Sequence, residues 1–204
     1  MNGMVTGWRL VGLLGLMLTA MAAVLAIAAS TDVEAARLVI RWTARTSLVL
    51  FLLAFVASAL ARLAPGAGSQ ALIGRRPALG LGFAISHGWH LAGILALAYL
   101  DPVLFGQLTN PVTIGSGVIA YLFIAAMAAT SSDRAVRWLG AANWRRLHMT
   151  GSWYLFLSFV VAFGKRAVVN TDYVPAMILL ALALALKVAA AYKTRTNARC
   201  AVAE

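Results

Sequence analysis

Composition excludes a soluble fold for this chain of 204 residues. The apolar fraction is 62% and the charged fraction is 11%, whereas an average soluble domain is about half apolar and about one quarter charged. The formal net charge of +11 comes from 17 Lys and Arg against 6 Asp and Glu. These cations lie between apolar runs and leave no continuous basic face, which argues against nucleic-acid binding and is typical of membrane orientation signals.

Apolar runs of about 20 residues are long enough to cross a hydrocarbon layer of roughly 30 Å as helices. Six runs fit, which predicts an all-α integral membrane protein, a six-transmembrane-helix bundle. The spans lie near 10–29, 46–64, 78–100, 112–130, 145–164 and 174–192. Pro77, Pro111 and Pro175 each lie close to a predicted helix start, where the missing N–H would have been unpaired anyway.

The first run imitates a secretory signal peptide, because Arg9 precedes it and small residues end it. It exceeds the usual apolar region of about 7–15 residues, so we expect a first span. No loop is long enough to fold separately, and we expect residues 1–204 to form a single membrane domain. The chain shows no dinucleotide-binding glycine pattern and no P-loop, so we expect no flavin or nucleotide site in it.

Lys and Arg are distributed unequally on the two sides of the predicted spans, with twelve on one side and five on the other. Because these residues favour cytoplasmic loops, we expect both termini to be cytoplasmic. The twelve are Arg9, Arg62, Arg75, Arg76, Arg134, Arg137, Arg145, Arg146, Lys187, Lys193, Arg195 and Arg199. The five are Arg37, Arg41, Arg45, Lys165 and Arg166.

All three histidines of the chain fall inside predicted spans, His87 and His90 in the third and His148 in the fifth. A residue that can ionise or bind metal is expensive in hydrocarbon, so each is a functional hypothesis. No Asp, Glu or Cys lies near the middle of a span, and the single cysteine, Cys200, lies in the polar tail. Imidazole is therefore the only ligand type available, and two imidazoles from different helices are what a six-coordinate b-type heme requires.

The spacing of these residues permits such a site. His87 and His90 are three apart, hence on roughly one face of a helix, and either could meet His148 if the two helices are neighbours. Both helices start on the same side, so we expect the histidines at comparable depth. Four arginines just below could pair with heme propionates: Arg75, Arg76, Arg145 and Arg146. Five glycines could let a flat macrocycle or another helix approach: Gly80, Gly82, Gly88, Gly93 and Gly151.

The third and fifth spans resemble the ferric-reductase-like transmembrane domain family. The matching segments are RRPALGLGFAISHGWH (75–90) and RWLGAANWRRLHMTGSWY (137–154). The family includes the heme-binding membrane subunit of the bacterial periplasmic methionine sulfoxide reductase system. The resemblance covers roughly 75–165 and implies that His90 and His148 are the axial ligands of heme iron, with His87 as the alternative to His90. It also implies a multi-pass protein of the bacterial cytoplasmic (inner) membrane.

The chain departs from this family at two places. Relatives carry another fifth-helix histidine about thirteen residues after the first, where this chain has Val161. Oxidase-type members carry a second third-helix histidine where this chain has Leu100, Asp101 and Pro102. Because three histidines suffice for only one bis-imidazole heme, we expect one heme b and no stacked pair.

These observations give one leading hypothesis and two alternatives. The leading hypothesis is a b-type heme cytochrome, a ferric-reductase-like electron carrier without catalytic residues of its own. It would pass electrons from quinol or a separate reductase to a periplasmic partner or a small acceptor. The first alternative is a non-heme helical membrane protein, transporter-like or an assembly subunit, whose histidines join helices or relay protons. A three-histidine zinc or copper site is less expected, because no carboxylate base is near.

Overall fold

The computed structural model describes residues 2–200, and the side chains within 7–196. All regular structure in this range is helical. The elements are α1 (Asn2–Ala28), α2 (Asp32–Leu63), α3 (Ala67–Leu100), α4 (Pro102–Leu108), α5 (Pro111–Ala129), α6 (Asp133–Leu139), α7 (Ala141–Ala167), the 3-10 turn η1 (Thr171–Tyr173) and α8 (Val174–Cys200). Six helices of the described chain are long and apolar enough to span a membrane, namely α1, α2, α3, α5, α7 and α8. The predicted all-α fold with six spans is confirmed.

The helices extend well beyond the apolar runs that predicted them. α2 begins at Asp32, where the Thr31 hydroxyl caps the helix by accepting a hydrogen bond from the Glu34 backbone N–H at 3.1 Å. Arg37, Arg41 and Arg45, expected outside the second span, therefore lie within this helix. Hydropathy marks the part of a helix that hydrocarbon tolerates, whereas the capping residue marks where helical hydrogen bonding starts.

The prolines test the predicted helix starts. Pro111 is the first residue of α5 and Pro175 the second residue of α8, as expected. Pro77 is different, because α3 begins at Ala67 and Pro77 lies inside it. The expectation that Pro77 marks a helix start was wrong. A proline at this position removes one helical hydrogen bond within the third helix.

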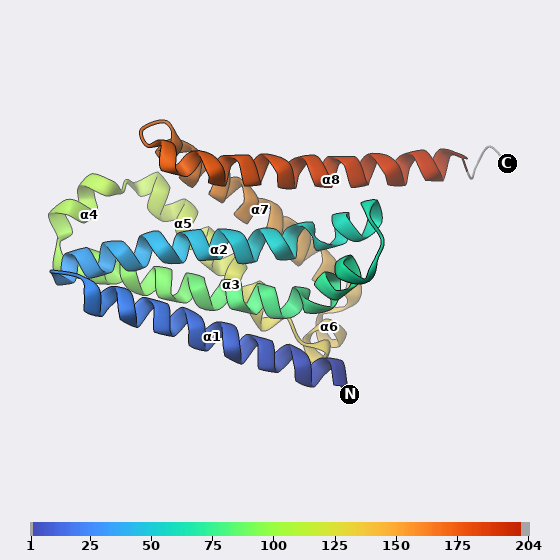
Figure 1. The fold of residues 1–204 in the computed structure, drawn as a ribbon, viewed down its shortest axis with the longest axis horizontal. Coiled ribbons are helices and arrows are strands. Elements are labelled where there is room, and N and C mark those ends of the chain that lie inside the picture. The colour runs from blue at the N-terminus through green and yellow to red at the C-terminus, as the bar shows by residue number, and fades with distance from the viewer. Residues whose placement is uncertain (1, 201–204) are drawn as a thin grey trace.

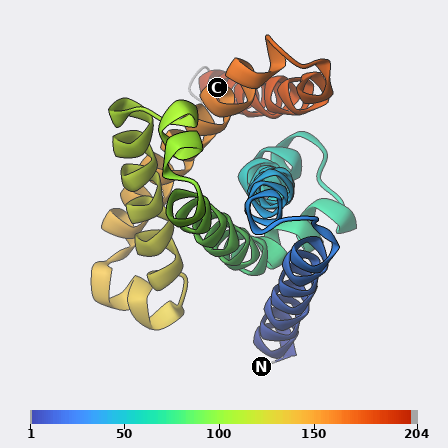
Figure 2. The same cartoon turned by 90° about the vertical axis from the view of Figure 1, so that its left-hand side faces the viewer.

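The long helices pack as an antiparallel bundle (Figures 1 and 2). α2 and α3 run side by side, and α1 contacts both of them. α8 packs against α2 and α7, while α5 packs against α7 and α3. The interior is thus bounded by α2, α3, α5, α7 and α8, and α1 lies outside this ring (Figure 2).

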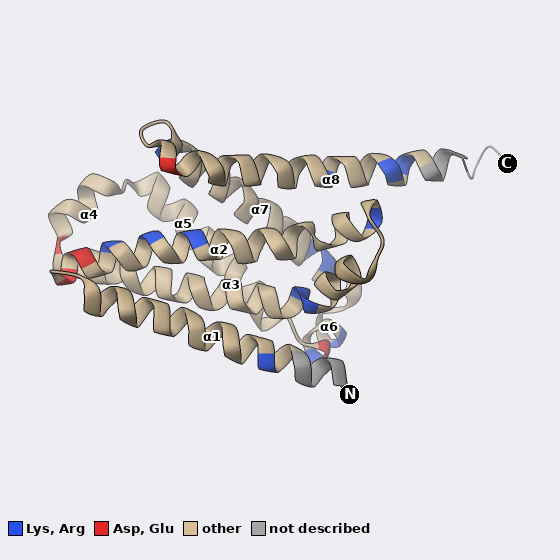
Figure 3. Ribbon diagram, viewed as in Figure 1, with Lys and Arg blue, Asp and Glu red and all other residues tan. Residues whose placement is uncertain are grey.

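Charge is distributed unequally between the two ends of the bundle, although Arg37, Arg41 and Arg45 lie in the first half of α2, near the acidic residues (Figure 3). α1 begins and α8 ends at the same end, where Lys and Arg also gather around α6; we call it the basic end. Asp32, Glu34 and Asp101 lie at the opposite end, where α2 begins and α3 stops. The termini therefore share one side, as expected, and its assignment as cytoplasmic stays a prediction.

Close helix contacts explain three of the five singled-out glycines. A Cβ on Gly93 would lie 2.9 Å from Ile40 Cγ1 and 3.3 Å from the Ala36 carbonyl oxygen of α2. A Cβ on Gly82 would meet Leu14 of α1 at 2.8 Å, and one on Gly151 would meet Met127 of α5 at the same distance. Gly80 and Gly88 have nothing within 4 Å of such a Cβ. Small residues of this kind allow helices to approach closely in membranes.

We predict that Gly93→Ala destabilises the bundle, because the added methyl group forces α3 away from the α2 backbone. Overpacking of this kind costs about 1–3 kcal/mol, against roughly 1 kcal/mol gained from helix propensity. The thermal midpoint of the detergent-solubilised protein should fall. Gly74→Ala, on the same helix with open space around its Cβ, is the control and should not lower the midpoint. Equal midpoints for both variants would contradict the packing assignment.

Candidate functional site

A polar seam joins α2 to α3 inside the bundle. Thr43, Ser47 and Ser86 are each 0% exposed. The Ser47 hydroxyl donates to Ser86 Oγ at 2.8 Å, and the Ser86 hydroxyl donates to the Thr43 carbonyl at 3.1 Å. Buried polar groups that satisfy one another across two helices fix the register of those helices. This seam holds the α3 residues around Ser86, including the histidines that follow it.

His90 is held by the same seam. Its Nδ1 lies 3.0 Å from the Ile40 carbonyl oxygen and 3.2 Å from Thr43 Oγ1. A carbonyl oxygen can only accept, so we assign the ring proton to Nδ1. In the neutral imidazole, Nε2 then keeps a free lone pair, and no described residue donates to it.

His87 sits one helical turn before His90, with the two ring centroids 5.4 Å apart. Its ring packs on Phe83 at 4.6 Å and meets Phe159 edge-on at 5.8 Å. Its Nδ1 is buried without a hydrogen-bond partner among the described residues. A buried polar atom without a partner usually marks a missing water, ion or ligand.

The two histidines line one cavity of ≈ 140 Å³, which we call the histidine-pair cavity. Three alanines from three helices, Ala44, Ala120 and Ala162, form part of its wall. The other lining residues are Leu155, Ser158, Phe159, Phe163 and Arg166. The cavity thus combines a mainly apolar wall, one serine, two imidazoles and one guanidinium.

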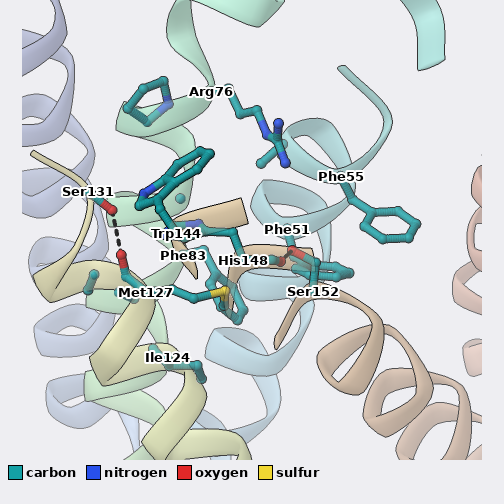
Figure 4. A pocket seen from close by; sticks show the side chains of 15 residues that line it. Phe51, Phe55, Arg76, Phe83, Ile124, Met127, Ser131, Trp144, His148 and Ser152 are labelled. Carbon is teal, nitrogen blue, oxygen red and sulfur yellow. Dashed lines mark hydrogen bonds between the residues drawn. The ribbon is translucent and has the colours of Figure 1, made fainter. Parts of the chain in front are cut away.

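His148 lies elsewhere. Its ring stacks on Trp144 with centroids 4.3 Å apart and planes at 28°, and its Nε2 lies 3.1 Å from Thr130 Oγ1. It lines a second cavity of ≈ 140 Å³, the apolar cavity (Figure 4). Phe51 and Phe83 form part of that wall, and Arg76 lies at its edge. The apolar cavity and the histidine-pair cavity have no lining residue in common. Phe83 lies between them, because it lines the apolar cavity and packs on His87.

The structure therefore brings two of the three histidines together and leaves the third apart. Phe159, which contacts His87, follows His148 by eleven positions in α7, a separation of about 16 Å along a helix. The expectation of comparable depth was wrong for a simple reason. His87 lies twenty positions after the first residue of α3, whereas His148 lies seven after the first residue of α7.

Of the four arginines predicted to contact heme propionates, two line cavities and two do not. Arg76 lines the apolar cavity, and Arg76 and Arg145 line a third cavity at the basic end. Arg75 and Arg146 line none of the three cavities. Three cations that the sequence had suggested only as orientation signals also line cavities, namely Arg62, Arg166 and Lys187. The position of Lys187 inside the last span was the signal that could have identified it.

Metal sites other than heme find little support among the described residues. They contain no group of three or more His, Cys, Asp or Glu side chains placed to hold a metal ion. The side chain of Cys200 lies outside the described range. A three-histidine zinc or copper site is therefore not assembled here.

We predict that Ser86→Ala destabilises the protein, because Ser47 loses its acceptor and the Thr43 carbonyl loses a donor in a buried seam. Leaving buried polar groups unpaired costs about 1–3 kcal/mol. The thermal midpoint should fall, as measured for the purified protein in detergent. Ser116→Ala is the matched control, since Ser116 is exposed and its hydroxyl donates only to the Thr113 carbonyl of its own helix. A loss as large in the control as in Ser86→Ala would contradict the role of the seam.

Comparisons of the chain with models of known protein families, with curated proteins and with solved structures find no match.

Proposed function

We propose that the chain is a b-type heme membrane cytochrome, an oxidoreductase subunit that carries single electrons. The observation that carries this proposal is the setting of His90. His90 lines a cavity inside the bundle, and its Nδ1 donates to the Ile40 carbonyl. Its Nε2 has no hydrogen-bond partner among the residues that the structure describes. Histidines that bind metal almost always donate their other ring N–H to a carbonyl, carboxylate or water.

The residues around His90 fit an axial ligand of heme. The bond to Ile40 fixes the tautomer and the ring orientation and raises the basicity of Nε2. The alanines of the cavity leave room beside the ring, and Arg166 supplies a cation for an acidic substituent. When bound, heme supplies the one-electron chemistry, while the protein sets its potential through the ligand and burial.

The setting of His90 supports an electron carrier, and the resemblance to the ferric-reductase-like family suggests its surroundings. We propose a place in the bacterial cytoplasmic membrane, with electrons arriving from quinol or a separate reductase. The acceptor would be a periplasmic redox partner or a small molecule. The six spans support the membrane part of this proposal.

A second candidate rests on the same hydrogen bonds. His90 joins α3 to α2 through Ile40, and His148 joins α7 to Thr130 at the end of α5. Such bonds are what a non-heme helical membrane protein uses to hold its helices, and a buried imidazole pair can also relay protons. Heme content separates this candidate from the first.

We predict that the purified protein, expressed with heme available, shows the spectrum of a b-type cytochrome that changes on reduction with dithionite. His90→Ala should lower the heme-to-protein ratio at least tenfold, because the proposed iron ligand is gone. The ratio is measured from heme absorbance against protein concentration, with a thermal midpoint to confirm folding. A colourless wild-type protein that takes up no added heme would favour the second candidate.

The same measurement on His148→Ala tests the ligand pair that the sequence predicts. Because His148 lines a different cavity, we expect this variant to retain heme on His90 alone, so that the ligand pair predicted from the sequence would not form. Loss of heme in His148→Ala would restore the predicted pair of His90 and His148. His87→Ala should retain heme as well. If His87→Ala instead loses heme while His90→Ala retains it, His87 is the ligand from α3.

A further inference from the structure

The third cavity, at the basic end, is lined by four cations from four different helices, and we call it the basic cavity. Its volume is ≈ 230 Å³. The cations are Arg62 of α2, Arg76 of α3, Arg145 of α7 and Lys187 of α8. No Asp or Glu lines it. Like charges gathered in this way repel one another, so an anion between them would be stabilising.

The position of Lys187 shows that membrane orientation alone does not explain this group of cations. Orientation signals are Lys and Arg in loops and at helix ends, yet Lys187 lies inside the last apolar run, thirteen positions after the start of α8. Its side chain is half-buried, and its Nζ lies 4.3 Å from the centroid of the Phe55 ring of α2. The charge is thus turned into the bundle, where a cation without a partner is expensive.

Carboxylates of the described chain do not lie where they could neutralise this cavity. Asp32, Glu34, Asp101 and Asp172 belong to the opposite end of the helices. Asp133 is the first residue of α6 and lines none of the three cavities. No carboxylate of the described residues supplies the counter-charge, and we assign it to a ligand.

The basic cavity adjoins the apolar cavity. The two share Phe55, Arg76, Trp144, His148 and Ser152 in their walls. Beyond these residues the wall is apolar apart from Ser131, and its apolar residues include Phe51, Pro77, Gly80, Phe83, Ile124 and Met127 (Figure 4). A ligand that fills both parts has an anionic head and an apolar chain.

We propose that the two cavities together bind an anionic phospholipid of the membrane. Its phosphate lies among Arg62, Arg76, Arg145 and Lys187, and part of one acyl chain enters the apolar cavity. Basic pockets between membrane helices are suited to anionic headgroups, and guanidinium groups bind phosphate through paired hydrogen bonds. The site is separate from the proposed heme ligand His90, which lines a different cavity.

The test measures lipid binding to the full chain purified in detergent, by native mass spectrometry with added dioleoylphosphatidylglycerol or dioleoylphosphatidylcholine. The wild-type protein should prefer the anionic lipid. The double variant Arg76→Gln with Lys187→Gln should bind phosphatidylglycerol at least tenfold more weakly. The matched control is Arg134→Gln with Arg137→Gln, which removes the same charge from exposed positions of α6 and should change binding less than twofold. Equal binding by the two double variants would overturn the proposal.

Two further arms identify the source of the anion. Glycerol 3-phosphate carries the headgroup chemistry without the chain, and binding as tight as that of the lipid would overturn the lipid assignment. The lipid assignment would also be overturned if the double variant of Arg76 and Lys187 binds phosphatidylglycerol unchanged but loses heme. These cations would then bind heme propionates.

A second variant keeps the test decisive if the charge variant fails to fold. Gly80→Leu fills the apolar cavity without changing charge, and open space surrounds the Gly80 Cβ position. It should weaken phosphatidylglycerol binding at least fivefold and leave glycerol 3-phosphate binding unchanged. Unchanged lipid binding in this variant would overturn the placement of the acyl chain.

Discussion

Hydrocarbon offers no hydrogen-bond partners, so polar side chains on membrane helices must satisfy one another. In this chain that constraint decides how α2 and α3 meet, because Thr43, Ser47 and Ser86 are fully buried and bond across the two helices. The same contact positions His90, whose Nδ1 bonds to the Ile40 carbonyl of α2. Gly93 lets the two backbones approach at this level. The candidate ligand thus depends on the register of a single helix pair.

The bundle separates two kinds of chemistry. The histidine-pair cavity holds two imidazoles among small apolar residues, whereas the cavities at the basic end hold four cations, His148 and an apolar extension. Between them lies a group of aromatic rings, in which Phe51 packs on Phe83 at 5.5 Å and on Phe159 at 5.3 Å. A redox group on one side and a lipid on the other would therefore occupy distinct places in the same bundle.

The sequence predicted the fold better than the site, for physical reasons. Apolar length alone identifies spans, so the six spans were correct, but it does not locate helix starts, and Pro77 was misplaced for that reason. Without helix starts, the relative depth of His87 and His148 could not be predicted. The seam of Thr43, Ser47 and Ser86 depends on pairing between α2 and α3, which sequence spacing does not specify. Lys187 was visible as a charge inside a span, but the direction of its side chain was not.

We propose that His90 presents the free lone pair of Nε2 to heme. The most direct test is a titration of purified, heme-free protein with hemin, followed by absorbance before and after dithionite reduction. We expect saturation at one heme per chain, a reduced b-type spectrum, and no such spectrum in His90→Ala of equal thermal stability. Identical titrations for the wild-type protein and His90→Ala, or no binding by either, would contradict it.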